Sequence, residues 1–149
     1  PADNPMNAMI SFGNTLLYTK TISQIYNTHL EQSISYLHEP SEGRFSLSLD
    51  LSEVFKPVIV FKTIFDLVNN KKINVEKHFE EKLNYSLLNE NGKKIFIQAF
   101  EDRINQTFEH PKLNRKITYK QAIKLDGYKL IKYIMESKDF IPFDLEKKE

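Results

Sequence analysis

The most informative absence in this 149-residue sequence is cysteine, of which there is none. A chain without cysteine has no disulfide framework, no thiol nucleophile, no iron–sulfur cluster and no zinc site built on thiolates. Glycine is scarce, at four residues, and neither a glycine-rich phosphate loop nor a G-x-S-x-G nucleophile motif occurs. The motif H-E-x-x-H and an adjacent His-Asp pair are absent too. These absences exclude most nucleotide-binding and hydrolase families.

Long hydrophobic runs are also absent. The longest apolar run is Val58 to Phe61, whereas a membrane-spanning helix needs about 18 residues or more. Hydrophobic content of 40% and charged content of 28% are typical of a soluble globular protein. A length of 149 residues fits one compact domain, residues 1–149. The sequence therefore predicts a single cytoplasmic domain with no membrane partner.

The net charge of +1 conceals an uneven distribution along the chain. Residues 1–57 carry three basic and six acidic side chains, a net charge of −3. Residues 58–149 carry 18 basic and 14 acidic side chains, a net charge of +4. An acidic segment beside a basic remainder is what a metal site on a polyanion-binding surface would produce, although random scatter also gives such splits.

Hydrophobic periodicity predicts an all-α fold, a helical bundle of about four main helices plus short helices, with little or no strand. Residues 57–68 are apolar on nearly every face, which is typical of a helix in the middle of a bundle. The first expected helix runs from Pro5, after Asn4 as N-cap, to about residue 29, and the second runs from Pro57 to Val68. A third helix is expected after Asn91-Gly92, and its predicted buried residues are Ile95, Phe96, Ala99, Phe100 and Ile104. The last helix is expected from a capping box of Thr118 and Gln121 to about Ser137.

Three segments are ambiguous. Residues 30–46 are irregular, with Pro40 and Gly43 indicating a loop. Residues 45–50 alternate like a strand, yet the residues that follow are equally typical of a first helical turn. Residues 83–88 fit one short strand or a loop, and Gly13 is a point where the first helix would loosen.

One histidine has acidic neighbours in the sequence. His38 is followed twelve residues later by Asp50 and then by Glu53, and in a helix these two carboxylates share one face. One imidazole with two carboxylates suits Mn²⁺ or Mg²⁺ better than structural zinc. On spacing alone, ordinary roles are favoured, with His38 as a hydrogen-bonding residue near a turn and Asp50 as a helix cap.

Two basic residues, Arg44 and Lys56, flank the carboxylates and are candidates for holding DNA phosphates. From the sequence alone, ordinary solvated charge is the favoured interpretation of both. The lysines of residues 120–132 are likewise typical of a solvated helix face.

Several ordered blocks resemble the C-terminal helical domain of CRISPR-associated protein one, the integrase of spacer acquisition. The resemblance is dense over residues 4–57 and continues more loosely through Phe100 to Arg103 and a helix with Tyr119 and Gln121. The dense blocks are Asn4 to Gly13 (NPMNAMISFG), Leu16 to Tyr18 (LLY), Tyr36 to Pro40 (YLHEP), Gly43-Arg44, and Ser48 to Pro57 (SLDLSEVFKP).

This resemblance implies a metal-dependent DNA nuclease and integrase. With a small partner, the second CRISPR-associated protein, such an enzyme joins 3′-hydroxyl ends of captured double-stranded DNA to the repeat array by transesterification. The family's metal ligands are a Glu, a His and a further acidic residue, and the last two fall on His38 and Glu53. The supporting acidic residue of the catalytic site falls on Asp50, and the basic residue of the same block falls on Lys56. The implied cofactor is Mn²⁺ or Mg²⁺.

The resemblance covers only part of that family. The family's first Glu ligand lies upstream of the Asn4 block, and so does a β-rich domain that makes the homodimer. The chain opens on Pro1 without an initiator Met, so we expect a piece of a longer protein that binds metal weakly and lacks integrase activity by itself. Two alternatives stay open: a non-catalytic helical module that binds nucleic acid or protein, and an unrelated metal phosphohydrolase, against which the missing His-Asp pair argues.

Overall fold

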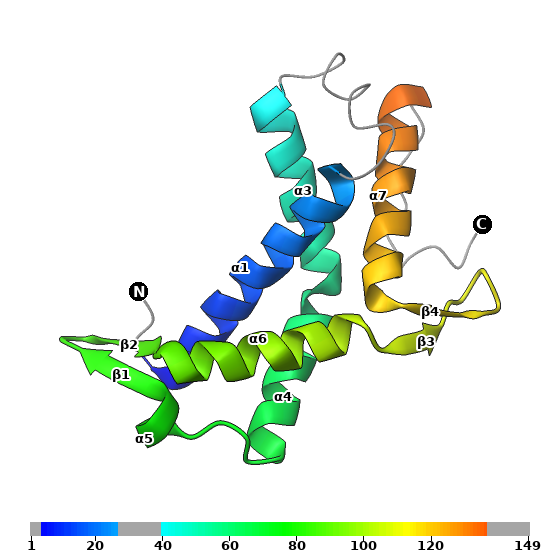
Figure 1. Ribbon diagram of the computed structural model, residues 1–149. Helices are drawn as coiled ribbons and strands as arrows, with labels where there is room; N and C mark the ends of the chain where they lie inside the picture. Colours follow the sequence, from blue (N-terminus) through cyan, green and yellow to red (C-terminus); the bar gives the residue numbers. More distant parts are fainter. Residues whose placement is uncertain (1–3, 27–39, 137–149) are drawn as a thin grey trace. The chain divides into compact units, whose positions relative to one another are not determined.

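The computed structural model describes residues 4–26 and 40–136 (Figure 1). These residues form a mainly helical fold, as the sequence predicts, with two short antiparallel hairpins in addition. In chain order the elements are α1 (Pro5–Tyr26), α3 (Pro40–Lys56), the π-helical turn η1 (Pro57–Phe61), α4 (Lys62–Asn69), α5 (Val75–His78), β1 (Phe79–Lys82), β2 (Tyr85–Leu88), α6 (Glu90–Ile104), β3 (Thr107–Glu109), β4 (Lys116–Thr118) and α7 (Tyr119–Glu136).

The chain divides into two compact units. The first unit contains residues 1–17 and 56–104, and the second contains residues 18–55 and 105–149. Helix α1 begins in the first unit and ends in the second, while α3 lies in the second unit except for Lys56. Among the described residues, no helix is long and apolar enough to cross a membrane.

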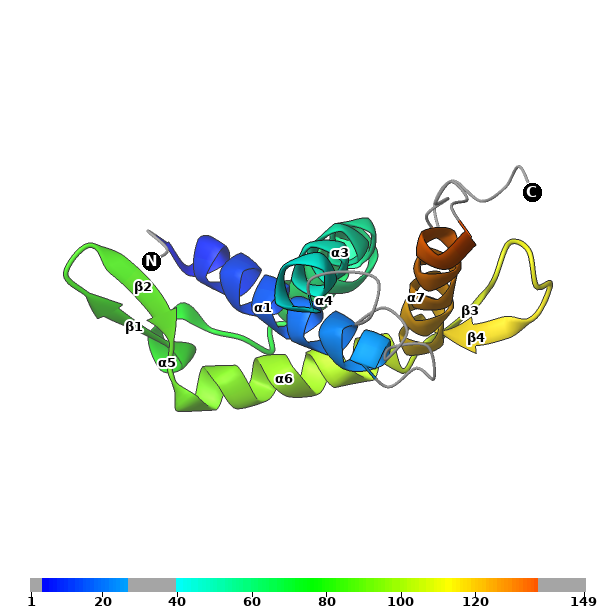
Figure 2. The same ribbon diagram turned by 90° about the horizontal axis from the view of Figure 1, so that it is seen from above.

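The core of the first unit forms around helix α6, which contacts η1 and α4. Figure 2 shows α6 following the β1–β2 hairpin in the chain. Phe96, Phe100 and Ile104 recur at steps of four and are buried, which confirms three residues of the stripe predicted from periodicity. Ile95 and Ala99, the other two residues of the predicted stripe, are half-buried. The ring of Phe96 meets that of Phe12 on α1 edge to face, with ring centroids 5.5 Å apart. This T-shaped pair adds specific aromatic geometry to the burial of apolar surface.

Gly13 lies in an uninterrupted α1, so the prediction of a loosened helix at this point is wrong. A Cβ atom placed on Gly13 would lie 2.6 Å from Cγ1 of Val60 and 3.1 Å from the Phe96 ring. The glycine is therefore required by close packing against Val60 and Phe96.

Two of the helical glycines, Gly13 and Gly127, give predictions of opposite sign. We expect Gly13→Ala to destabilise the protein by about 1–3 kcal/mol, because buried Val60 is β-branched and has little room to move. Gly127→Ala in α7 should stabilise it by about 0.5–1 kcal/mol, because the new Cβ would meet Ile25 at an ordinary 3.6 Å. Urea unfolding of both variants measures the two values, and the same sign in both would contradict this description of the packing.

The beginning of α6 is fixed by a side-chain cap and by the β1–β2 hairpin. Asn89 accepts a hydrogen bond from the amide of Gly92 at 2.8 Å, so the helix begins at Glu90, earlier than predicted. Gly92 lies in the first turn, where a Cβ atom would lie 2.3 Å from the carbonyl oxygen of His78. The hairpin pairs Phe79 with Leu88, and residues 85–88 are therefore a strand.

The segment 57–68 is helical, yet it is not a central helix of a bundle. Ile59, Val60, Ile64 and Leu67 are buried, whereas Phe61, Phe65 and Val68 are exposed, Phe65 to 58%. The expectation of burial on every face was wrong because apolar residues also occupy the solvent side of this helix. The exposed apolar residues line a shallow groove with Met6 and Ile10 of α1.

The second unit contains the β3–β4 hairpin and α7. Thr118 and Gln121 form the predicted capping box: the Thr118 amide donates to Gln121 Oε1 at 2.8 Å, and the Gln121 amide donates to Thr118 Oγ1 at 3.0 Å. The ring of Phe108 stacks on that of Tyr119 with centroids 4.4 Å apart, which ties the hairpin to the first residue of α7.

Candidate metal and DNA site

The two candidate carboxylates lie on a helix. Residues 45–50 belong to α3, so the strand interpretation is wrong, and α3 begins at Pro40, within the segment predicted as a loop. Proline is well tolerated at the first position of a helix, because the amide hydrogen that it lacks has no helical partner there. Asp50 lies in the interior of α3, which rules out a role as its N-terminal cap.

The packing of α3 directs both carboxylates toward solvent. Leu51 and Phe55 are fully buried, and Ser48 and Ser52 lie on the same buried side. The Ser52 hydroxyl donates to the carbonyl oxygen of Leu49 at 2.8 Å, which satisfies this polar group within the helix. Asp50 and Glu53 are exposed on the opposite side. Because they are three residues apart in a helix, their side chains are neighbours on one face.

The chemistry of this pair fits a hard divalent cation. Carboxylate oxygens are the ligands that Mg²⁺ and Mn²⁺ prefer in proteins. Two carboxylates do not complete a site, and within residues 4–26 and 40–136 no group of three or more histidine, aspartate or glutamate side chains is arranged to hold a metal ion. His38, the predicted third contributor from this chain, lies outside the described residues. Asp50 and Glu53 are thus the part of the predicted site that the structure brings together.

The two predicted phosphate contacts both belong to α3. Lys56 is the last residue of this helix, is half-buried, and interacts with other residues of the protein. A cation in the last turn also interacts favourably with the negative end of the helix dipole. Arg44 lies in the first half of α3, and its side chain is outside the described part of the structure.

Two of the four lysines of α7 lie on a solvated face as the sequence predicts, and the other two, Lys124 and Lys129, are half-buried. Lys120 and Lys132 are exposed, and Lys124 lies over the Tyr128 ring at 5.9 Å. Lys129 approaches the buried carboxylate of Asp126 at 4.0 Å.

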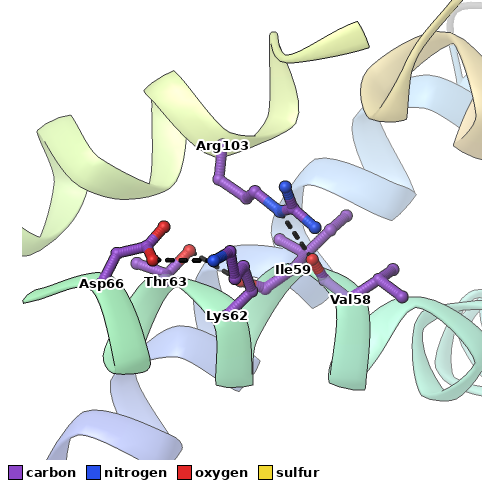
Figure 3. A network of polar contacts seen from close by, with 6 residues as sticks. All are labelled: Val58, Ile59, Lys62, Thr63, Asp66 and Arg103. Carbon is purple, nitrogen blue, oxygen red and sulfur yellow. Dashed lines mark hydrogen bonds and ion pairs between the residues drawn. The ribbon is translucent and has the colours of Figure 1, made fainter. Parts of the chain in front are cut away.

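A feature that the sequence analysis missed follows α3 directly. Residues Pro57–Phe61 form a π-helical turn, and Arg103 of α6 donates a hydrogen bond from Nε to the carbonyl oxygen of Val58 at 2.7 Å (Figure 3). The Thr63 hydroxyl donates to the carbonyl oxygen of Ile59 at 2.6 Å. Pro57 is the residue from which this irregular turn could have been predicted. A proline inside a helical run has no amide hydrogen and disturbs the regular ladder of helical hydrogen bonds.

Comparison with known proteins identifies the family of this chain. The family model described as "CRISPR associated protein Cas1" matches residues 1–102. The "CRISPR-associated endonuclease Cas1" of Fusobacterium nucleatum is 49% identical over 145 residues, which are 97% of this chain and 43% of the relative. The "CRISPR-associated protein Cas1 1" of Methanobrevibacter ruminantium is 48% identical over 143 residues, which are 96% of this chain and 44% of the relative.

Solved structures agree with this result. A Cas1 protein from Thermotoga maritima matches with a TM-score of 0.76 and 46% identity, over 91% of this chain and 41% of that one. A casposase bound to an integration product matches with the same TM-score at 21% identity, over 99% of this chain and 42% of that one, and so supports the fold alone. The chain spans less than half the length of the curated relatives that it matches. The chain belongs to the Cas1 family.

Proposed function

We propose that this chain is the C-terminal catalytic part of a metal-dependent DNA endonuclease and integrase of CRISPR adaptation, which inserts captured DNA into the repeat array by attack of a 3′-hydroxyl. Membership of the Cas1 family supports this proposal, since relatives that match nearly all of this chain are named endonucleases. The observation that carries it is the pair of exposed carboxylates one turn apart on α3.

In this proposal His38 and Glu53 hold Mn²⁺ or Mg²⁺, and Asp50 supports the site from the adjacent turn of α3. A divalent ion stabilises the charge that builds up on a phosphate during strand transfer. The packing of Leu51 and Phe55 against the core fixes the helix, so the carboxylates meet the ion without large rearrangement. Arg44 and Lys56 hold phosphates of the DNA backbone on either side of the carboxylates.

The proposed partners are double-stranded DNA and the small second CRISPR-associated protein, and the longer protein forms a homodimer. Because the chain covers less than half of its relatives, we expect it to bind Mn²⁺ weakly and to lack integrase activity by itself. A strand-transfer assay of the 149-residue chain in Mn²⁺ checks this expectation. Activity equal to that of the full-length protein would contradict it.

The variant His38→Ala of the full-length protein distinguishes a catalytic role of this chain from a role in binding alone. We expect strand transfer and DNA cleavage to fall by about 100-fold or more, as when a single electrostatic contributor is removed from an active site, while DNA binding in a gel-shift assay is retained. His78→Ala is the control, because the Nδ1 atom of His78 accepts a local hydrogen bond from the Asn74 amide and has no proposed catalytic role. If His38→Ala left every DNA-processing activity intact, the chain would instead be a non-catalytic binding module.

A further inference from the structure

The first turn of α6 contains the only Asn-Gly pair of the chain, Asn91 and Gly92. In such a pair the glycine nitrogen can attack the side-chain amide carbon of the asparagine, because glycine has no side chain to hinder the approach. The glycine nitrogen gives up its proton, the side-chain nitrogen leaves as ammonia, and a succinimide ring closes. Water then opens the ring to aspartate or isoaspartate. The Asn91 side chain is exposed and therefore accessible to this chemistry.

Packing does not permit another residue in place of Gly92. A Cβ atom on Gly92 would lie 2.3 Å from the carbonyl oxygen of His78 and 2.9 Å from Cδ2 of Leu88. The backbone of His78 cannot easily move away, because its carbonyl oxygen also accepts a hydrogen bond from the Asn89 amide at 2.9 Å. The fold therefore requires a glycine directly after Asn91, and the reactive pair is built into the start of α6.

Asn89 holds this pair in an unreactive arrangement. All four polar groups of Asn89 form hydrogen bonds. Its Oδ1 accepts from the Gly92 amide at 2.8 Å, its Nδ2 donates to the Lys77 carbonyl oxygen at 2.8 Å, its amide donates to His78, and its carbonyl oxygen accepts from the Lys93 amide at 2.9 Å. The bond to Gly92 bears directly on the chemistry, because the proton donated to Asn89 is the proton that the Gly92 nitrogen must lose.

The helical backbone adds a geometric barrier. Gly92 is buried in the first turn of α6, away from the water or hydroxide that would remove its proton. A helical side chain points toward the N-terminus of its helix, which directs the Asn91 amide away from the nitrogen of the following residue. Ring closure thus requires the turn to open, and its rate follows the fraction of molecules in which the turn is open.

We propose that Asn91 is a conditional deamidation site: it is protected while the Asn89 side chain caps α6, and it is modified when the first turn of α6 opens. An isoaspartate at this position would add a methylene group to the backbone, one turn before the buried Phe96. The modification would therefore loosen the start of the central helix of the first unit. This inference does not depend on the proposed DNA-processing function.

The test measures conversion of Asn91 by mass spectrometry after incubation of the full-length protein at mildly alkaline pH. We expect Asn89→Ala to accelerate conversion about fivefold, the change in open population that follows from loss of a typical N-cap. Asn89→Asp keeps an acceptor for the Gly92 amide and should stay within about twofold of the wild type. Gln98→Ala, which removes an exposed hydrogen bond to Asp102 later in α6, is the matched control and should leave the rate unchanged. An unchanged rate in Asn89→Ala would overturn the inference.

Hydrogen exchange of the Gly92 amide, measured on the same samples, tests the mechanism. One opening exposes this amide to both reactions, so exchange and deamidation should accelerate by the same factor in Asn89→Ala. Should that variant fail to fold, low concentrations of urea open the same turn in the wild type, and the two rates should again rise together. Deamidation that accelerates without faster exchange would contradict the proposal.

A synthetic peptide of residues 85–97 gives the unprotected reference rate. We expect Asn91 to deamidate much more slowly in the folded protein than in this peptide, which is too short to form a stable helix by itself. Equal rates in peptide and protein would show that the cap gives no protection and would overturn the inference.

Discussion

Glu53→Gln in the full-length protein should reduce DNA strand transfer by about 100-fold or more, the size of effect expected when a charge that supports the transition state is removed. The substitution preserves the shape and the helix propensity of the side chain and removes only its charge. Because Glu53 lies on the exposed side of α3, we expect the free energy of unfolding to change by less than about 1 kcal/mol. The loss of activity would then reflect chemistry and not folding.

Two further variants make this prediction specific. Asp50→Asn should reduce strand transfer less, by about tenfold, because Asp50 only supports the site in this account. Glu81→Gln, an exposed carboxylate in β1, should have no effect and serves as the control for loss of negative charge. Strand transfer is measured under single-turnover conditions with a labelled 3′-hydroxyl strand. Wild-type rates in Glu53→Gln, with Mn²⁺ present, would contradict the assignment of this residue.

Phe96→Ala should destabilise the first unit by about 3–5 kcal/mol, the range measured for large aromatic residues in protein cores. Phe96 is fully buried, packs edge to face on Phe12, and lies 3.1 Å from the position that a Cβ of Gly13 would take. Removing the ring therefore leaves a cavity beside Phe12 and Gly13 of α1. Such a loss is a large fraction of the stability of a typical domain.

The adjacent residue provides the control for this prediction. Ile97 is 41% exposed on the outer side of α6, so Ile97→Ala should cost less than about 1 kcal/mol. Urea unfolding followed by circular dichroism measures both values. Equal effects of the two substitutions would contradict the orientation of α6.

Local signals in the sequence predicted the elements that local interactions determine. The N-cap at Asn4, which accepts a hydrogen bond from the Asn7 amide at 2.8 Å, and the capping box at Thr118 were both recognisable from residue type and spacing. The buried stripe of α6 was equally clear, since its apolar residues repeat at helical steps. These features depend on residues within a few positions of one another.

Features that depend on distant residues were not predictable in the same way. The hairpin strands are three or four residues long, too short for a periodic pattern. Gly13 was interpreted as a weak point because the close approach of Val60 is a tertiary contact. The π turn depends on Arg103, and nothing in residues 57–61 alone identifies that partner.

The candidate site was predictable from the order of motif blocks, and the structure adds how two of its residues are presented. Spacing alone left Asp50 as a possible cap, and the position of Asp50 inside α3 removes that alternative. The burial of Leu51 and Phe55 explains why the carboxylates face solvent. The roles of all five residues stay predictions of the family resemblance: His38, Arg44, Asp50, Glu53 and Lys56.

In the proposed site His38, together with Glu53 on α3, holds the divalent ion. The most direct measurement is electron spin-echo spectroscopy of Mn²⁺ bound to the full-length protein, which detects a histidine nitrogen coordinated to the ion. We predict one such nitrogen signal in the wild type and its disappearance in His38→Ala. A bound Mn²⁺ without a histidine nitrogen, or a nitrogen signal that persists in His38→Ala, would contradict the account.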